Sequence, residues 1–265
     1  MSDSQPSRDK TPQQILLFLG LVLVVGSIFV AWKTSLRREV NTKLAKIRAE
    51  GLPATAAELD QWYVLPPSET NAADLYANAF RAWKEPTEEQ LRWLPVIGST
   101  NFPPVGVPLP EEMQQAVEVF LSDNSDTLRR LHEAAQVKHC RYPVDLSNGM
   151  ATLLPHLTYL RKSARLLALQ ADYAARNGNP SATVAAIQNG LAVGESLRSE
   201  PLHISQLVRI ACLGITTLAL ERALWATPLQ EAELKILELA VLEADKPQAL
   251  FFLIGRRTKF WKLRF

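Results

Sequence analysis

The stretch PHLTYLRKSARLLALQADYAARNGNPSATVAAIQNGLAVG, residues 155–194, decides the fold class of this chain. Apolar residues recur along its first half at spacings of three and four: Leu157, Leu160, Ala164, Leu167, Ala171 and Ala174. That spacing is typical of the core-facing stripe of an α-helix. Pro155 suits the first turn of the helix, and residues 177–180, Asn-Gly-Asn-Pro, end it and form a turn. Val184, Ile187 and Leu191 then share one face of a second helix, so the stretch predicts an antiparallel helical hairpin.

A second pair of helices follows. Residues 202–225, LHISQLVRIACLGITTLALERALW, are apolar nearly all round from Leu207 to Leu220, which predicts a central helix. Thr227, Pro228 and Gln230 give a capped start to a fourth helix that ends near residue 245. Successive hairpins have the style of tetratricopeptide repeats, but the motif does not repeat. We predict an all-α fold, with a bundle or irregular stack of hairpins over residues 150–250 and a basic aromatic tail over 251–265.

Residues 51–138 predict a separate N-terminal helical part. Helix starts are indicated by Thr55 with Glu58, by Asn71, and by Thr87 with Gln90. Residues 99–110, STNFPPVGVPLP, hold four prolines and predict an extended loop, either a binding loop or a plain connector. Helices are expected again at 110–122 and 125–138. Residues 139–149, HCRYPVDLSNG, break the helical pattern and predict a connecting loop between the two helical parts.

Residues 15–32, ILLFLGLVLVVGSIFVAW, carry no charge and predict a transmembrane helix. Eighteen helical residues span roughly 27 Å, about the thickness of a bilayer core. A cleaved signal peptide is the alternative, but the small residues of a cleavage site are poorly placed, which favours a retained anchor. Residues 1–14 are polar and predict disorder. A basic juxtamembrane helix over 33–50 is expected to continue from the span until Gly51 and Pro53 stop it.

The net charge of +2 is unevenly distributed along the chain. Residues 33–48 carry six basic residues and one acidic residue, and residues 255–265 carry five basic residues, so each segment has a net charge of +5. The intervening body, residues 49–254, therefore carries −8. We expect 15–32 to contact the lipid bilayer and 33–48 and 256–264 to contact anionic lipid head groups. The acidic body argues against a nucleic-acid partner.

Two stretches resemble a known family. They are LAKIRAEGLPATAAELDQWYVLPPSETNAADLY, residues 44–76, and HCRYPVDL, residues 139–146. They are similar to a family of bacterial single-pass membrane proteins with a helical soluble domain and no assigned activity, from the anchor to about residue 245. The resemblance implies a bacterial cytoplasmic membrane with the soluble part outside it. The basic residues after the span favour the cytoplasmic side, although long domains translocate regardless, so the side stays open.

The best metal-like group comprises His132, His139 and Cys140, with Glu133 and Asp145 nearby. Their spacing lacks the tight, repeated pattern of zinc sites. Cys140 as a nucleophile would need a base such as His156 or His203, placed beside it by the fold. The sequence contains neither a glycine-rich phosphate loop nor a serine nucleophile elbow. We therefore assign no catalytic, cofactor-binding or metal-binding residue from the sequence.

Three hypotheses for function remain. The leading one is a membrane-anchored, non-enzymatic protein-interaction or scaffold module with an unidentified protein partner. The second is an envelope-associated enzyme with a helical active site near residues 139–145. The third is a structural membrane component.

Overall fold

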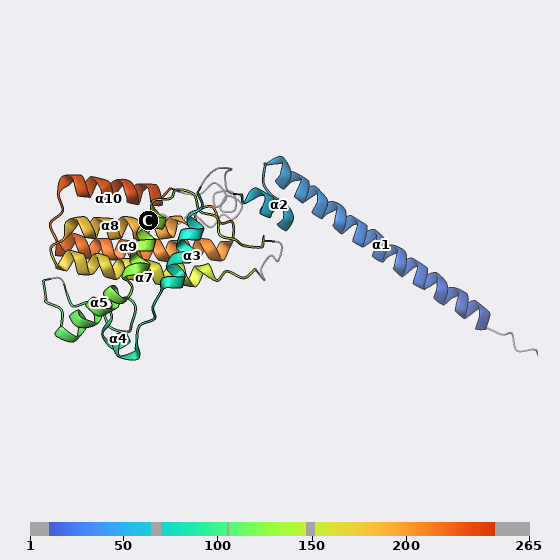
Figure 1. The fold of residues 1–265 in the computed structure, drawn as a ribbon. Helices are drawn as coiled ribbons and strands as arrows, with labels where there is room; N and C mark the ends of the chain where they lie inside the picture. The colour runs from blue at the N-terminus through green and yellow to red at the C-terminus, as the bar shows by residue number, and fades with distance from the viewer. Residues whose placement is uncertain (1–10, 65–69, 105, 147–151, 247–265) are drawn as a thin grey trace, which may run out of the picture. The chain divides into compact units, whose positions relative to one another are not determined.

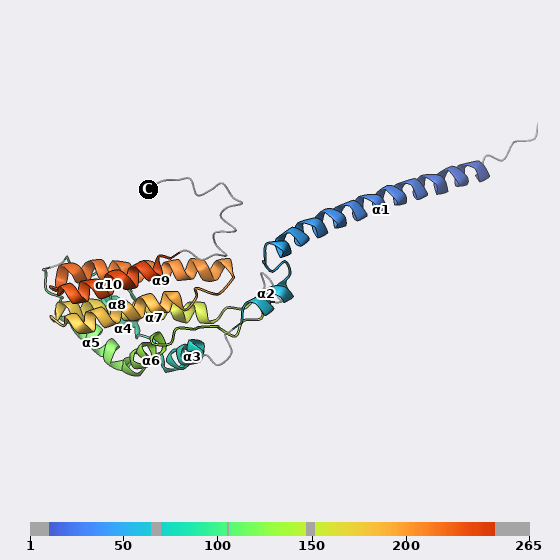
Figure 2. The same cartoon turned by 90° about the horizontal axis from the view of Figure 1, so that it is seen from above.

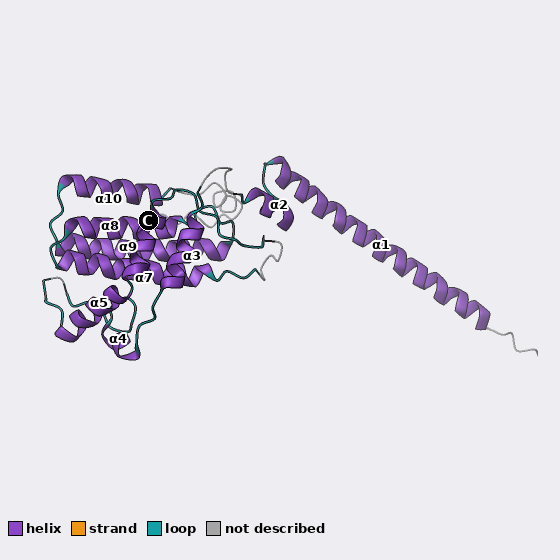
Figure 3. Cartoon of the chain, in the orientation of Figure 1, coloured by secondary structure: helices purple, strands orange, loops and turns teal. Residues whose placement is uncertain are grey.

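The computed structural model describes residues 11–64, 70–104, 106–146 and 152–246. Within these residues the chain forms ten helices and no strand, which confirms the all-α fold (Figures 1 and 3). The tail 251–265, most of the polar start 1–14 and part of the loop 139–149 lie outside the described residues. The chain divides into two compact units, residues 1–59 and 60–265.

The first unit is dominated by one long helix. α1, Thr11–Ala49, runs without a break through both the predicted span and the predicted juxtamembrane helix. It is long and apolar enough to cross a membrane. Gly51 follows it with φ +74°, the left-handed conformation that commonly ends a helix. Glu58, in α2 (Ala56–Trp62), accepts hydrogen bonds of 2.7 and 2.9 Å from the Arg48 guanidinium. This ion pair fixes the turn between α1 and α2.

The second unit has three layers of helices (Figure 2). The middle layer is the predicted hairpin, α7 (His156–Arg176) and α8 (Pro180–Glu195). α9 (His203–Ala226) and α10 (Glu231–Ala244) cover one side of it. On the opposite side lie α3 (Ala72–Ala82), α5 (Glu111–Asp123) and α6 (Ser125–Ala135), with the short α4 (Glu88–Trp93) against α5.

Close packing between α8 and α9 depends on two glycines. A Cβ atom at Gly190 would lie 2.7 Å from Thr216 Oγ1, and one at Gly194 would lie 2.7 Å from Leu213 Cδ2. Because real Cβ atoms do not approach other atoms so closely, larger residues would push the two helices apart. The glycines therefore allow α9 to lie directly on α8.

Most of the predicted helix starts are confirmed. Asn71 Oδ1 accepts from Ala73 N at 3.2 Å, and Thr87 forms a reciprocal capping box with Gln90. α10 begins with a capping box between Gln230 and Glu233, whereas Thr227 is the buried C-cap of α9. The helix expected to reach residue 138 ends earlier, at Ala135, and residues 137–145 have no regular secondary structure.

The prediction that the third helix of the C-terminal part is central is wrong. α7 is the central helix, because α8 and α9 both pack along it and nearly every turn of it is buried. α9 buries only one side, including Cys212, Thr216 and Ala219, and exposes the other. Apolar residues all round a helix normally indicate burial on all sides, so the exposed half of α9 calls for an explanation.

Candidate functional site

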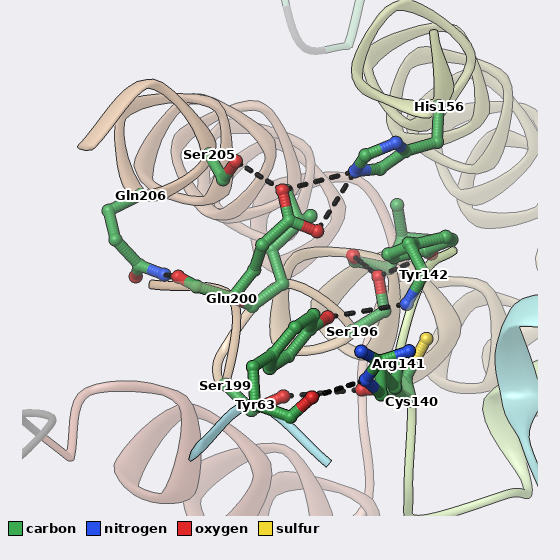
Figure 4. Close-up of polar contacts among 12 residues, drawn as sticks. Tyr63, Cys140, Arg141, Tyr142, His156, Ser196, Ser199, Glu200, Ser205 and Gln206 are labelled. Carbon is green, nitrogen blue, oxygen red and sulfur yellow. Dashed lines mark hydrogen bonds and ion pairs between the residues drawn. The ribbon is translucent and has the colours of Figure 1, made fainter. Parts of the chain in front are cut away.

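A cluster of buried polar side chains lies where α7 and α9 begin and α8 ends (Figure 4). His156 is the first residue of α7, Glu200 lies in the connection between α8 and α9, and Ser205 lies in the first turn of α9. His156 Nε2 is 3.0 and 3.2 Å from the two carboxylate oxygens of Glu200. Ser205 Oγ donates a short hydrogen bond to the same carboxylate. Glu200 is 0% exposed, so its carboxylate depends on these two partners for hydrogen bonds in place of water.

The backbone around Glu200 is also held by hydrogen bonds. Gln206 Nε2 donates to the carbonyls of Leu197 and Glu200, at 2.9 and 2.7 Å. These bonds satisfy two carbonyl groups that follow the end of α8. The carboxylate is thus fixed by its own backbone as well as by the side chains around it.

Residues 139–146 form one wall of the cluster. The Tyr142 ring stacks on His156 with ring centroids 4.2 Å apart, and the Tyr142 hydroxyl is 2.9 Å from Ser196 Oγ. Asn71 holds the segment through two hydrogen bonds with the backbone of Arg141, each 2.9 Å long. The predicted connecting loop is therefore a packed, hydrogen-bonded part of the second unit, over the residues that the structure describes.

The order of the hydrogen bonds limits the chemistry of this cluster. In a serine hydrolase the histidine accepts the serine proton, and the carboxylate orients the histidine. Here the carboxylate of Glu200 lies between Ser205 and His156 and binds both of them. The arrangement supplies hydrogen-bond partners to a buried carboxylate and does not activate a serine, so we regard it as a structural network.

The candidates that the sequence suggested do not assemble into a site. The described residues contain no group of three or more histidine, cysteine, aspartate or glutamate side chains placed to hold a metal. His132 Nε2 lies 3.1 Å from Gln170 Oε1 on α7, and the His139 carbonyl accepts from Ala72 N. Burial raises the pKa of Cys140 to about 12, so its thiol stays protonated at neutral pH. That protonation argues against Cys140 as a nucleophile.

The proline-rich loop 99–110 is fastened to the bundle by two arginines. Arg176 donates to the carbonyls of Pro103 and Val107, and the guanidinium groups of Arg176 and Arg222 lie 5.2 and 5.3 Å from the centre of the Phe102 ring. Arg222 also binds both carboxylate oxygens of Asp172, which is 3% exposed. Burial raises the pKa of Asp172, and the charge of Arg222 opposes that rise.

The second unit also exposes many large apolar side chains on α9 and α10. We call these side chains together the outer face: Ile204, Leu207, Ile210, Leu218, Leu224, Trp225, Leu234, Ile236, Leu239 and Leu242. Each of these side chains is between 42% and 75% exposed. Apolar patches of more than a few hundred Å² are uncommon on soluble proteins and mark sites of interaction.

Glu200, Ser205 and the outer face were all missed by the sequence analysis. Glu200 and Ser205 lie at a helix boundary, and nothing in their spacing from His156 indicates a contact. The apolar residues of the outer face were visible but were interpreted as core. A signal was nonetheless present, because α9 has more apolar positions than one neighbouring hairpin can cover.

The chain matches no family model, no curated protein and no solved structure. The resemblance to a bacterial membrane-protein family therefore stays a prediction, and the proposal for function rests on the geometry.

Proposed function

We propose that this protein is a single-pass membrane protein of the bacterial cytoplasmic membrane, and that its soluble part is a non-enzymatic protein-interaction module. In this proposal α1 crosses the bilayer through residues 15–32, and its basic continuation contacts anionic head groups. The outer face of α9 and α10 takes an apolar segment of a protein partner. The single observation that carries the proposal is the row of large apolar side chains on α9 and α10 that no described residue covers.

The charge around the outer face defines the chemistry of its occupant. Residues 231–245, which form α10 and its C-cap, carry five acidic residues and one lysine, a net charge of −4. Complementary potentials steer association and select partners. An apolar segment with basic residues beside it fits this surface better than a neutral or acidic one.

The buried polar cluster supports the same proposal in a different way. His156 and Ser205 are both engaged with Glu200, and the Tyr142 ring stacks on His156. Binding and catalytic groups normally converge on a concave, accessible site. The accessible surface with unusual chemistry is the outer face.

The proposal is tested with a photo-crosslinking amino acid placed in the full chain in its native membrane. Leu239 on α10 is 56% exposed and lies on the outer face, whereas Gln115 on α5 is an exposed control on the opposite side of the unit. We expect protein adducts from position 239 and none from position 115. If position 239 yields no adduct, or yields lipid adducts only, the outer face is not a protein-binding surface.

A further inference from the structure

A groove on the second unit lies where α6 and α10 both pack against α8. Its volume of about 430 Å³ falls within the range of ligand-binding pockets. Gln136, Gln188 and Glu243 are exposed at its rim, whereas Asn189 and Leu191 of α8 are only 5% and 4% exposed at its bottom. None of the side chains of the outer face lines this groove, so the two surfaces are distinct.

Asn189 is a buried polar side chain that the described residues leave without a hydrogen-bond partner. Its side-chain amide carries one acceptor oxygen and two N–H donors, and it bonds to no residue that the structure describes. The amide atoms are nonetheless accessible from the groove that Asn189 lines. Because buried polar groups normally have partners, the free amide indicates a position for a ligand that donates and accepts hydrogen bonds.

The carboxylates that line the groove are already paired with basic residues. Glu195 pairs with Arg209 at 2.6 Å and with Arg198 at 2.8 Å. Glu243 pairs with Arg198 at 2.9 Å and also with Lys246. A charged ligand would lose its hydration without gaining a free counter-charge from these groups, so the groove favours a neutral ligand.

The shape of the groove fits an extended chain. Small side chains, including Ala185 and Ala192 of α8 and Ala240 of α10, line it and leave room for another backbone to come close. From Ala185 to Glu195 the α8 lining extends roughly 15 Å along the helix axis. An extended chain advances about 3.3 Å per residue, so this length holds about four or five residues.

On these grounds we propose that the groove binds a short extended peptide segment of a partner protein, with the Asn189 amide hydrogen-bonded to one of its peptide groups. A peptide group is neutral and offers both a carbonyl acceptor and an N–H donor, which match the two sides of the Asn189 amide. A carboxylate would use only the donors of Asn189, and an ammonium group only its oxygen. The site goes beyond the proposed function, because it shares no residue with the outer face.

The experiment selects ligands from a phage-displayed library of random peptides, with the full chain in detergent as the target. The affinities of the recovered peptides are then measured for the native chain and for variants. Asn189→Leu removes the amide at nearly constant size, and it should fold normally because the amide makes no hydrogen bond with the described residues. Ala192→Leu fills the groove, and Ala77→Leu at an exposed position of α3 is the matched control.

We expect peptides whose dissociation constant rises about tenfold in Asn189→Leu, because a buried peptide group then loses its hydrogen bonds. The rise should be at least as large in Ala192→Leu and absent in Ala77→Leu. A second measurement replaces one peptide bond of the ligand at a time with an ester, which removes a single N–H. At one position the ester should weaken binding to the native chain severalfold and leave binding to Asn189→Leu unchanged.

Three results overturn the proposal. Recovery of no peptide would mean that water alone solvates the Asn189 amide. Peptides whose affinity is the same in Asn189→Leu, Ala192→Leu and the native chain bind elsewhere, and loss of their binding in Leu239→Ser would reject the groove but keep the outer face as the interaction surface. Ester effects that are equal in the native chain and in Asn189→Leu would show that no peptide group bonds to Asn189.

Discussion

The buried polar cluster and the outer face reverse the usual distribution of polarity. The cluster places a carboxylate, an imidazole and a hydroxyl inside the protein, whereas the outer face places leucine, isoleucine and tryptophan side chains at the surface. The buried polar cluster is enclosed by contacts between segments far apart in the chain. The outer face is not covered by any of the described residues. The difference shows that the composition of a helix does not define which of its sides the fold will cover.

The largest expected effect is the loss of stability when the buried polar cluster loses one of the partners of Glu200. Replacing His156 with alanine removes a hydrogen-bond partner of the buried Glu200 carboxylate. Leaving a buried polar group without a partner costs about 1–3 kcal/mol and more for a carboxylate, so we expect the free energy of unfolding of the full chain in detergent to fall by about 3 kcal/mol. Urea unfolding followed by far-UV circular dichroism measures the change.

A second substitution separates charge from packing at the same place. Glu200→Gln in the His156→Ala background should recover part of the lost stability, because an amide costs less to bury than a carboxylate. A loss of less than about 1 kcal/mol for His156→Ala alone would show that water solvates the carboxylate, and the cluster would not be closed.

Substitutions of Gly190 and Gly214 compare the packed interface between α8 and α9 with the outer side of α9 directly. Gly190→Ala places a methyl group against Thr216, and overpacking of this kind typically costs about 1–3 kcal/mol. Gly214 lies on the outer side of α9 with no atom within 4 Å of a built Cβ among the described residues. Gly214→Ala should therefore stabilise the protein by about 0.5–1 kcal/mol through helix propensity alone.

Urea unfolding of the two alanine variants beside the native chain measures both effects. Equal changes in stability would contradict the difference between the two sides of α9. A loss of stability for Gly214→Ala in place of a gain would show that another segment packs closely against the outer face at that position.

The smallest effect is the pH dependence contributed by Asp172. Its folded-state pKa is raised by burial, so protonation is easier in the folded than in the unfolded chain. The stability linked to Asp172 is then fully present below the unfolded-chain pKa and is lost as the pH rises through the folded pKa. The native chain should lose stability relative to Asp172→Asn as the pH rises above about 4, by at most about 1.4 kcal/mol per pH unit.

Unfolding free energies of both chains across this pH range give the difference, in which the other titrating groups largely cancel. A difference that does not change with pH would mean that Arg222 fully offsets the burial of Asp172. A change in the opposite direction would mean that the ion pair outweighs burial.

Local patterns in the sequence predict the helices of this protein well but not their neighbours. The stripe from Leu157 to Ala174 and the turn at 177–180 predicted α7 and α8 closely, because spacing and turn residues are local signals. The contact between His156 and Glu200 joins residues 44 positions apart and leaves no periodic trace. The apolar run from Leu207 to Leu220 predicted a central position for α9, which is wrong. Periodicity shows which positions are apolar, but it does not show whether a neighbouring helix covers them.

The length of α1 has a consequence for the basic residues that follow its apolar run. Thirty-nine helical residues extend about 58 Å, and a hydrocarbon core occupies only about 30 Å of that length. When α1 stands along the bilayer normal, Lys33, Arg37 and Arg38 lie within about 10 Å of the hydrocarbon edge, at head-group depth. Lys46 and Arg48 lie more than about 20 Å away, beyond the roughly 8 Å over which salt screens the lipid charge. In the proposed membrane arrangement, the length of α1 thus separates basic residues within reach of the head groups from basic residues beyond that reach. Arg48, one of the latter, pairs with Glu58.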